Sequence, residues 1–367
     1  MSPSPSSTGA LLEARGVTKH FPIRGGELFR RSREAVHAVD NVSLEVFPGE
    51  TLGLVGETGC GKSTLARCLT RLYDITGGEV WFDGRDISEL SRRQMRPLRR
   101  EMQMIFQDPY GSLNPRRRVG SIIGDAFAIH HMDESSGRKR QVQDLMELVG
   151  LNPEHYNRFP ADFSGGQRQR IGVARALALH PKLIVCDEPV SALDVSIQAQ
   201  VLNLLTDLQV ELGLTYVFIS HDLSVVRHVS DRIAVMYLGH IVETGPSDTI
   251  FEKPRHPYTR ALLSALPVAD PDTADSRRRI VLVGDIPSPV RPPSGCRFHP
   301  RCPKARRDCV EVVPLLEPVF DDRADHRTAC HHPLAVGEDL TLSEPAIEDS
   351  QLRAESGSVG WERRHDA

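Results

Sequence analysis

The sequence predicts an α/β fold built around a phosphate-binding loop, and three observations carry that prediction. A glycine-rich loop, Gly56–Ser63, follows the apolar run 51–55 and opens an amphipathic stretch at 65–69, which is the order strand, loop, helix. A second apolar run, 183–188, ends in two carboxylates. A third, 216–220, ends at a histidine. Apolar strands alternating with helical stretches are typical of a sheet with helices on its faces.

The loop matches the pattern G-x-x-x-x-G-K-[ST], whose spacing has a chemical reason. Glycines let successive backbone N–H groups curl round a phosphate, and the helix that follows directs the positive end of its dipole at the same anion. Lys62 supplies a cation and Ser63 a magnesium ligand. The residues predicted to hold a triphosphate are Gly56, Glu57, Thr58, Gly59, Cys60, Gly61, Lys62, Ser63 and Thr64.

The composition of the chain limits the size of its domains and the kinds of partner that it can bind. A chain of 367 residues accommodates one large domain and a smaller one, and a net charge of −4 argues against nucleic acid as a partner. The arginines within 92–100 and 116–118 are read as solvated faces, with an interface beside anionic lipid as the alternative. No apolar stretch approaches a membrane span, so we expect a cytoplasmic chain, with the seven cysteines as thiols or metal ligands.

The chain divides into four predicted segments. Residues 1–10 read as a disordered leader, 11–254 as a nucleotide-binding domain with an inserted helical subdomain at about 115–170, 255–333 as a cysteine-containing extension, and 334–367 as a disordered acidic tail. Within the domain, 12–17 is predicted as an edge strand, and 233–237 with 239–243 as a closing hairpin.

A second anion site is predicted at Ser164-Gly165-Gly166-Gln167. Ser164 is placed to cap a helix whose apolar residues follow at helical spacing, and the glycine pair leaves its N-terminus open to a phosphate. This site has no lysine of its own and is not part of the first loop. We therefore expect it to take a phosphate bound elsewhere.

Three polar side chains at strand ends suit hydrolysis of that phosphate. Asp187 is predicted to bind magnesium and Glu188 to activate the attacking water, with an acidic pair that caps the next helix as the alternative. His221 closes a strand predicted to run parallel to the one before Glu188, where it can reach a γ-phosphate. A purely structural histidine is the alternative there.

These motifs together resemble the ATP-binding subunits of ABC transporters over residues 11 to about 250. Residues 56–63 resemble the Walker A loop, 183–188 Walker B, 164–167 the signature and 191–194 the D-loop with Asp194. The resemblance implies that Gln107 contacts magnesium, with Ser63 and Asp187, as well as the membrane subunit. It also implies a switch role for His221 and stacking of adenine on Phe21. The implied fold is a mixed sheet core with an antiparallel β subdomain and an inserted helical subdomain, and the implied activity is ATP hydrolysis with Mg²⁺.

Further residues resemble the oligopeptide/dipeptide importers, and in particular the second, F-type ATPase of their usual unequal pair. They are residues 106–109, 112–115, 187–200 and 256–260, together with Gly59-Cys60-Gly61 and the insertion 24–31. The resemblance implies a head-to-tail dimer with a paralogous ATPase, two permease subunits at the cytoplasmic face of the cell membrane, and an extracytoplasmic binding protein. Nickel, glutathione or other small solutes remain as alternative cargoes, and a soluble non-transport ABC ATPase remains as the rival class.

Four cysteines of the extension form a further candidate site. Cys296, Cys302, Cys309 and Cys330 are spaced C-x5-C-x6-C-x20-C, and some relatives hold a [4Fe–4S] cluster on a similar set. Zinc suits four thiolates as well, and four reduced thiols without metal are the third alternative. Cys60, Cys68 and Cys186 are interpreted as packing residues.

Overall fold

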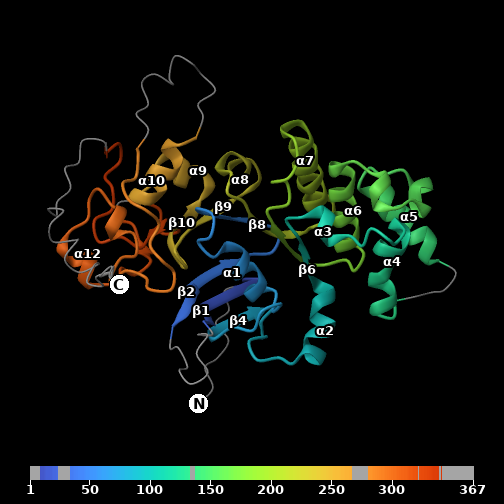
Figure 1. Ribbon diagram of the computed structural model, residues 1–367, viewed down its shortest axis with the longest axis horizontal. Helices are drawn as coiled ribbons and strands as arrows, with labels where there is room; N and C mark the ends of the chain where they lie inside the picture. Colours follow the sequence, from blue (N-terminus) through green and yellow to red (C-terminus); the bar gives the residue numbers. More distant parts are fainter. Residues whose placement is uncertain are drawn as a thin grey trace, which may run out of the picture.

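The computed structural model describes residues 9–23, 34–132, 137–266, 280–320, 322–338 and 340. Two sheets form the centre of the molecule, a helical region lies at one end, and the C-terminal extension lies at the other (Figure 1). No helix among the described residues is long and apolar enough to cross a membrane. The predicted leader at 1–10 lies largely outside the described residues, as does the predicted insertion 24–31.

The smaller sheet is antiparallel and has the strand order β2-β1-β4-β5. Its strands are β1 (Leu12–Pro22), β2 (Ala35–Val46), β4 (Gly77–Phe82) and β5 (Arg85–Asp86). The prediction of an edge strand at 12–17 was wrong, because β1 pairs with β2 on one side and with β4 on the other. An Asp-Gly turn joins β4 to β5, with φ of 50° at Asp83 and 73° at Gly84.

The larger sheet has the order β11-β12-β10-β9-β3-β8-β7-β6. Its strands are β3 (Thr51–Val55), β6 (Met102–Ile105), β7 (Leu183–Asp187), β8 (Thr215–Ile219), β9 (Arg232–Tyr237), β10 (His240–Pro246), β11 (Glu317–Pro318) and β12 (Arg327–Thr328). Strands β6, β7, β8, β3 and β9 run parallel, so the ends of β3, β7 and β8 meet at one edge. The predicted hairpin of β9 and β10 is confirmed.

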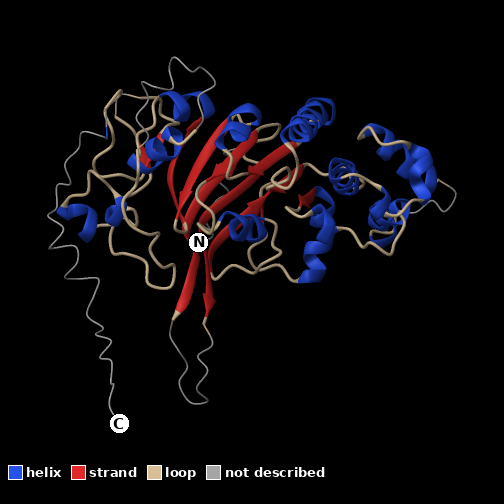
Figure 2. Ribbon diagram, turned by 45° about the horizontal axis from the view of Figure 1, so that its top comes forward, coloured by secondary structure: helices blue, strands red, loops and turns tan. Residues whose placement is uncertain are grey.

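Helices cover this sheet and extend beyond it (Figure 2). The described helices are α1 (Lys62–Leu69), α2 (Arg92–Glu101), α3 (Pro109–Ser112), α4 (Val119–Ile129), α5 (Arg138–Leu148), η1 (Pro153–Asn157), η2 (Pro160–Asp162), α6 (Gly165–Leu177), α7 (Val195–Leu212), α8 (Leu223–Val229), α9 (Ser247–Glu252), α10 (Pro257–Ser264), η3 (His299–Arg301) and α12 (Arg307–Glu311). Helices α4 and α5, with η1 and η2, lie within residues 115–170, where a helical subdomain was expected.

Two apolar cores hold these layers together. One lies between the antiparallel sheet, α1 and one face of the larger sheet, and includes Leu12, Leu65 and Val185. The other joins the opposite face to α6, α7 and the helical region, and includes Ile171 and Val201. Alternate residues of a strand point to opposite faces, and an apolar core covers each face of the larger sheet. The central strands are therefore apolar throughout, as the sequence pattern predicted.

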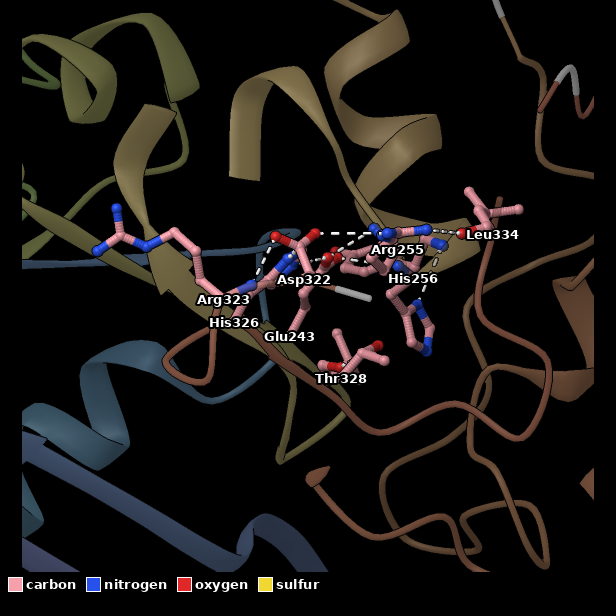
Figure 3. A network of polar contacts seen from close by, with 10 residues as sticks. Glu243, Arg255, His256, Asp322, Arg323, His326, Thr328 and Leu334 are labelled. Atoms are coloured by element: carbon pink, nitrogen blue, oxygen red, sulfur yellow. Dashed lines mark hydrogen bonds and ion pairs between the residues drawn. The ribbon is translucent and has the colours of Figure 1, made fainter. Parts of the chain in front are cut away.

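The C-terminal extension is fastened to the larger sheet by β12, which pairs with β10. A buried polar network reinforces this edge (Figure 3). The Glu243 carboxylate in β10 accepts hydrogen bonds from the backbone N–H groups of Arg255, at 2.6 Å, and His256, at 3.0 Å. It also lies 2.8 Å from His326 Nε2, whose Nδ1 lies 3.1 Å from Asp322. Arg255 extends the network to Asp322 and to the Leu334 carbonyl.

This network also bears on the predicted tail at 334–367. Leu334 N–H donates to the Arg255 carbonyl at 2.8 Å, and Leu334 and Leu340 are buried. Packed chain therefore continues past the predicted boundary at residue 333. Residues 341–367 lie outside the described part of the chain.

We expect His326 to stabilise the fold to an extent that depends on pH. Burial lowers the pKa of His326, but its hydrogen bonds and charge interactions with Glu243 and Asp322 outweigh burial and leave the pKa above its usual value. A histidine with a raised pKa stabilises the fold fully below its unfolded pKa of about 6.5, and this stabilisation is lost as the pH rises through the folded pKa.

We expect His326→Ala to lower the free energy of unfolding by about 3–5 kcal/mol at pH 6, because it removes the charged partner of the buried Glu243 carboxylate. The loss should shrink as the pH is raised from 6 to 9. Urea denaturation at both pH values measures it, and exposed His228→Ala is the control. An equal loss at both pH values would contradict a protonated His326.

Candidate active site

The glycine-rich loop follows β3 and leads into α1, as predicted. Lys62 is 5% exposed, and its ammonium donates to two carbonyls of the loop itself, Gly56 at 2.7 Å and Glu57 at 3.0 Å. Gly61 has a φ of 111°, and a Cβ atom there would lie 2.0 Å from the Ala38 carbonyl oxygen. Only glycine therefore fits at the start of α1. The loop thus keeps its curled form through backbone contacts and a lysine that spans it.

Ser63 and Asp187 meet next to this loop. Ser63 Oγ donates to Asp187 Oδ1 at 2.7 Å, which joins the start of α1 to the end of β7. Asp187 is 1% exposed, and burial raises its pKa against the opposing effect of the Ser63 hydrogen bond. An oxygen pair of this kind, one hydroxyl and one buried carboxylate, suits Mg²⁺. The predicted magnesium ligands Ser63 and Asp187 therefore lie together, whereas the Gln107 amide hydrogen-bonds Glu188.

Gln107 and His221 both reach Glu188. Gln107 Nε2 donates to Glu188 Oε2 at 2.8 Å, and His221 Nδ1 lies 3.3 Å from the same oxygen. Glu188 has a φ of 48°, a conformation that a non-glycine residue adopts at a cost of about 1–3 kcal/mol. Strain of this kind is typical of functional sites. Gln107, Glu188 and His221, the three residues expected to act in hydrolysis, follow β6, β7 and β8, and the sheet topology brings them together at one edge.

The signature helix is built as the sequence predicts. Ser164 caps α6 and Gln167 completes a reciprocal capping box. A Cβ atom on Gly166 would lie 2.4 Å from Ile197 Cγ2, so this glycine allows α6 and α7 to approach closely. Ser164, Gln167 and Asp194 are exposed, and α6 lies apart from α1 in Figure 1. The signature is therefore open to solvent and lies apart from the helix that follows the loop of its own chain.

Phe21 is only partly buried at the end of β1. Its ring packs edge-on against Tyr73 at a centroid distance of 5.7 Å, and Lys19 Nζ lies 4.9 Å from its centroid. Part of the ring is exposed. Stacking of adenine on Phe21 stays a prediction.

The four cysteines of the extension line one small cavity, together with His256, Phe298, His299, Lys304, His331 and His332. Burial raises the pKa of each thiol, to about 11 for Cys296 and about 12 for Cys330, and neighbouring cysteines add to the shift at Cys296, Cys302 and Cys330. These raised pKa values keep the thiols protonated at neutral pH unless a bound cation stabilises the thiolates. Among the described residues, no three of these sulfurs lie within 4.8 Å of one another.

Sequence reasoning missed two residues that contact the phosphate loop from the extension. Tyr258 Oη accepts from the Glu57 backbone N–H at 2.9 Å, and Arg301 forms a bidentate pair with the Glu57 carboxylate at 2.9 and 3.2 Å. The available signal was indirect. Tyr258 lies in the 256–260 motif, and Arg301 directly precedes Cys302.

A cluster of three histidines and Asp40 resembles a metal site, but an arginine supplies its positive charge. His20 and His37 lie 3.5 Å from Asp40, with His240 at 3.9 Å, which resembles a metal site. Arg297 of the extension, however, pairs with the Asp40 carboxylate and donates to the Leu238 carbonyl. The cation of this cluster is therefore an arginine, and the cluster fastens the extension to the β9–β10 hairpin.

Comparisons with known proteins agree with this geometry. Residues 39–191 match the family model described as "ABC transporter", and residues 242–309 match "Oligopeptide/dipeptide transporter, C-terminal region". A dimeric post-hydrolysis structure of the ATP-binding cassette MJ0796 with ADP and phosphate covers 64% of this chain and 98% of its own, with a TM-score of 0.57 and 27% identity. The phosphate loop, the two strand-end carboxylates and the signature helix thus define an ABC ATPase.

Curated relatives narrow this class. The oligopeptide transport ATP-binding protein AppF of Bacillus subtilis is 53% identical over 88% of this chain and 97% of its own. The di/tripeptide transport protein DppF of Pseudomonas aeruginosa is 51% identical over 88% and 97%, and OppF of Salmonella typhimurium 51% over 84% and 93%. The chain belongs to the oligopeptide/dipeptide branch of the ABC transporter ATP-binding proteins.

Glu188→Gln separates nucleotide binding from hydrolysis. Glutamine preserves the size of the side chain and can still contact Gln107, but it cannot accept a proton from water. We expect ATP hydrolysis to fall at least about 100-fold, the usual contribution of a general base, while ATP affinity changes less than about threefold.

Single-turnover hydrolysis and nucleotide titration measure the two effects, with exposed Glu211→Gln on α7 as the control. Hydrolysis at the wild-type rate in Glu188→Gln would assign the base to another residue.

Proposed function

We propose that this protein is the ATP-hydrolysing subunit of a membrane importer for oligo- or dipeptides. The observation that carries the proposal is one chain that combines a complete ATPase site with the peptide-transporter C-terminal region at 242–309. Relatives named for oligopeptide and di/tripeptide transport support the cargo class. The subunit would sit at the cytoplasmic face of the membrane, bound to two permeases that receive peptide from an extracytoplasmic binding protein.

The mechanism requires two ATPase subunits arranged head to tail. Lys62 and the loop N–H groups of one subunit would bind the phosphates, while Ser164 and the N-terminus of α6 on the other subunit would cover the γ-phosphate. The exposure of Ser164 and Asp194 supports this arrangement. The resemblance to an F-type subunit favours a paralogous partner. Mg²⁺, held by Ser63 and Asp187, would neutralise charge on the phosphates.

Glu188 carries the chemistry in this arrangement. Its carboxylate would accept a proton from the attacking water, and His221 would orient the γ-phosphate from the neighbouring strand. Gln107 contacts Glu188 from the end of β6, and the chain continues from there into α3 and α4. Any displacement of Glu188 would therefore be transmitted along this segment.

A groove beside Gln107 fits the permease contact. A cavity of about 830 Å³ lies between the end of β6, α1 and α4, and Phe106, Gln107, Ile122, Ile129 and Arg175 contribute to its lining. Its position between the catalytic edge and the helical region supports docking of a permease segment there. Closing of the dimer on ATP and opening after hydrolysis would then move this groove.

Transport should stop when hydrolysis stops. In proteoliposomes with the partner ATPase, the permeases and the binding protein, we expect Glu188→Gln to abolish ATP-dependent peptide uptake and Glu211→Gln to preserve it. Uptake of labelled peptide and of nickel measures activity and cargo. Peptide import that persists without hydrolysis would refute the mechanism, and nickel uptake without peptide uptake would refute the cargo.

We propose further that the four cysteines of the extension hold a [4Fe–4S] cluster. A single zinc ion with Zn–S bonds of about 2.3 Å draws its sulfurs to within about 4 Å of one another, whereas a cluster accommodates wider separations. All four cysteines line one cavity, which supports a shared metal site. Lys304, which lines the same cavity, would offset part of its negative charge.

The metal content tests this assignment. We expect anaerobically purified protein to contain iron and sulfide and to show broad visible absorption, both lost in Cys302→Ser. Cys68→Ser, in the buried core of the ATPase domain, is the matched control. Zinc at one equivalent without iron would replace the cluster by a zinc site, and protein free of both metals would leave four thiols.

A further inference from the structure

The extension contacts Glu57 of the phosphate loop at two groups, the side-chain carboxylate and the backbone N–H. Arg301 binds the carboxylate in a fork, with its two terminal nitrogens at 2.9 and 3.2 Å from the two oxygens. Tyr258 accepts the backbone N–H at 2.9 Å. Inside the loop, Lys62 donates to the Glu57 carbonyl. The side chain, the N–H and the carbonyl of Glu57 are therefore all held.

The extension fixes both of these contacts firmly. Tyr258 is fully buried and packs against Tyr237 and Phe298 at centroid distances of 4.7 and 5.4 Å. The Arg301 side chain is 9% exposed and lies 3.4 Å from Tyr237 Oη. A preorganised guanidinium of this kind loses little entropy when it binds a carboxylate.

The charge of Glu57 makes this contact relevant to ATP. A carboxylate in a loop that binds a triphosphate repels its ligand, unless a neighbouring cation compensates the charge. Lys62 approaches Glu57 through the carbonyl, whereas Arg301 is the described cation that pairs with the carboxylate. Arg301 thus provides both neutralisation and attachment at the same residue.

We propose that Arg301 is a positioning residue for nucleotide binding, through which the C-terminal extension holds the phosphate loop in its binding form. Tyr258 assists by fixing the Glu57 N–H. Arg301 contacts Glu57, which follows β3, whereas Glu188 follows β7. Among the described residues, no hydrogen bond or ion pair joins Arg301 to Glu188. Loss of Arg301 should therefore act on nucleotide affinity and leave the chemical step nearly unchanged. This inference rests on the proposed ATPase function.

The test is a double-mutant cycle on the full-length chain with ADP as the probe. We expect Arg301→Gln to weaken ADP binding and raise the KM for ATP about tenfold, with kcat within about twofold. Adding Glu57→Gln should restore most of the affinity, because the uncompensated charge is removed. A role for Arg301 in packing alone would give no such rescue.

Two further variants keep the outcome decisive. Arg301→Lys retains the charge without the fork and should give an intermediate KM, and it serves if Arg301→Gln does not fold. Arg307→Gln, which removes an exposed ion pair with Glu311 in the same extension, is the control and should bind ADP as the wild type does.

The outcomes separate the two proposals. An unchanged KM in Arg301→Gln, or a double variant as weak as Arg301→Gln, would overturn the positioning role while leaving the ATPase function intact. Absence of ADP binding by the wild-type chain would instead overturn the proposed function.

Discussion

The structure depends on one constraint. A backbone N–H group of the loop that binds a phosphate cannot also make a hydrogen bond that fixes the loop conformation. Its shape has to come from other contacts. Lys62 donates to the carbonyls of Gly56 and Glu57, and Gly61 passes the Ala38 carbonyl where no side chain fits. Ser63 ties the following helix to Asp187 on β7. None of these contacts uses a backbone N–H group of the loop.

The parallel sheet places the remaining chemistry around this loop. Because β3, β7 and β8 are neighbours and parallel, the residues that follow them converge at one edge. Gln107 and His221 both reach Glu188 although β6, β7 and β8 are far apart in sequence. Gln107 contacts Glu188 and lines the groove of about 830 Å³, so in the proposed importer it would link hydrolysis to a permease segment docked in that groove.

Much of this site was predictable from sequence, because its motifs are local. The loop, the cap at Ser164 and the apolar strands are each specified by adjacent residues. The position of β1 was not, since its alternation does not reveal that β4 covers its second edge. Arg301 and Tyr258 were missed because they contact Glu57 across 244 and 201 residues. Neither residue belongs to a pattern that marks it as part of a nucleotide site.

We infer that Arg301 and Tyr258 hold the phosphate loop through Glu57. Lys62 can then leave the loop carbonyls and bind a phosphate. A structure of the Glu188→Gln protein with ATP and Mg²⁺ tests it most directly. The account predicts that Lys62 Nζ leaves the Gly56 and Glu57 carbonyls for the nucleotide, while Glu57 stays bonded to Arg301 and Tyr258. A nucleotide-bound loop in which Glu57 has left both partners, or in which Lys62 still binds the two carbonyls, would contradict it.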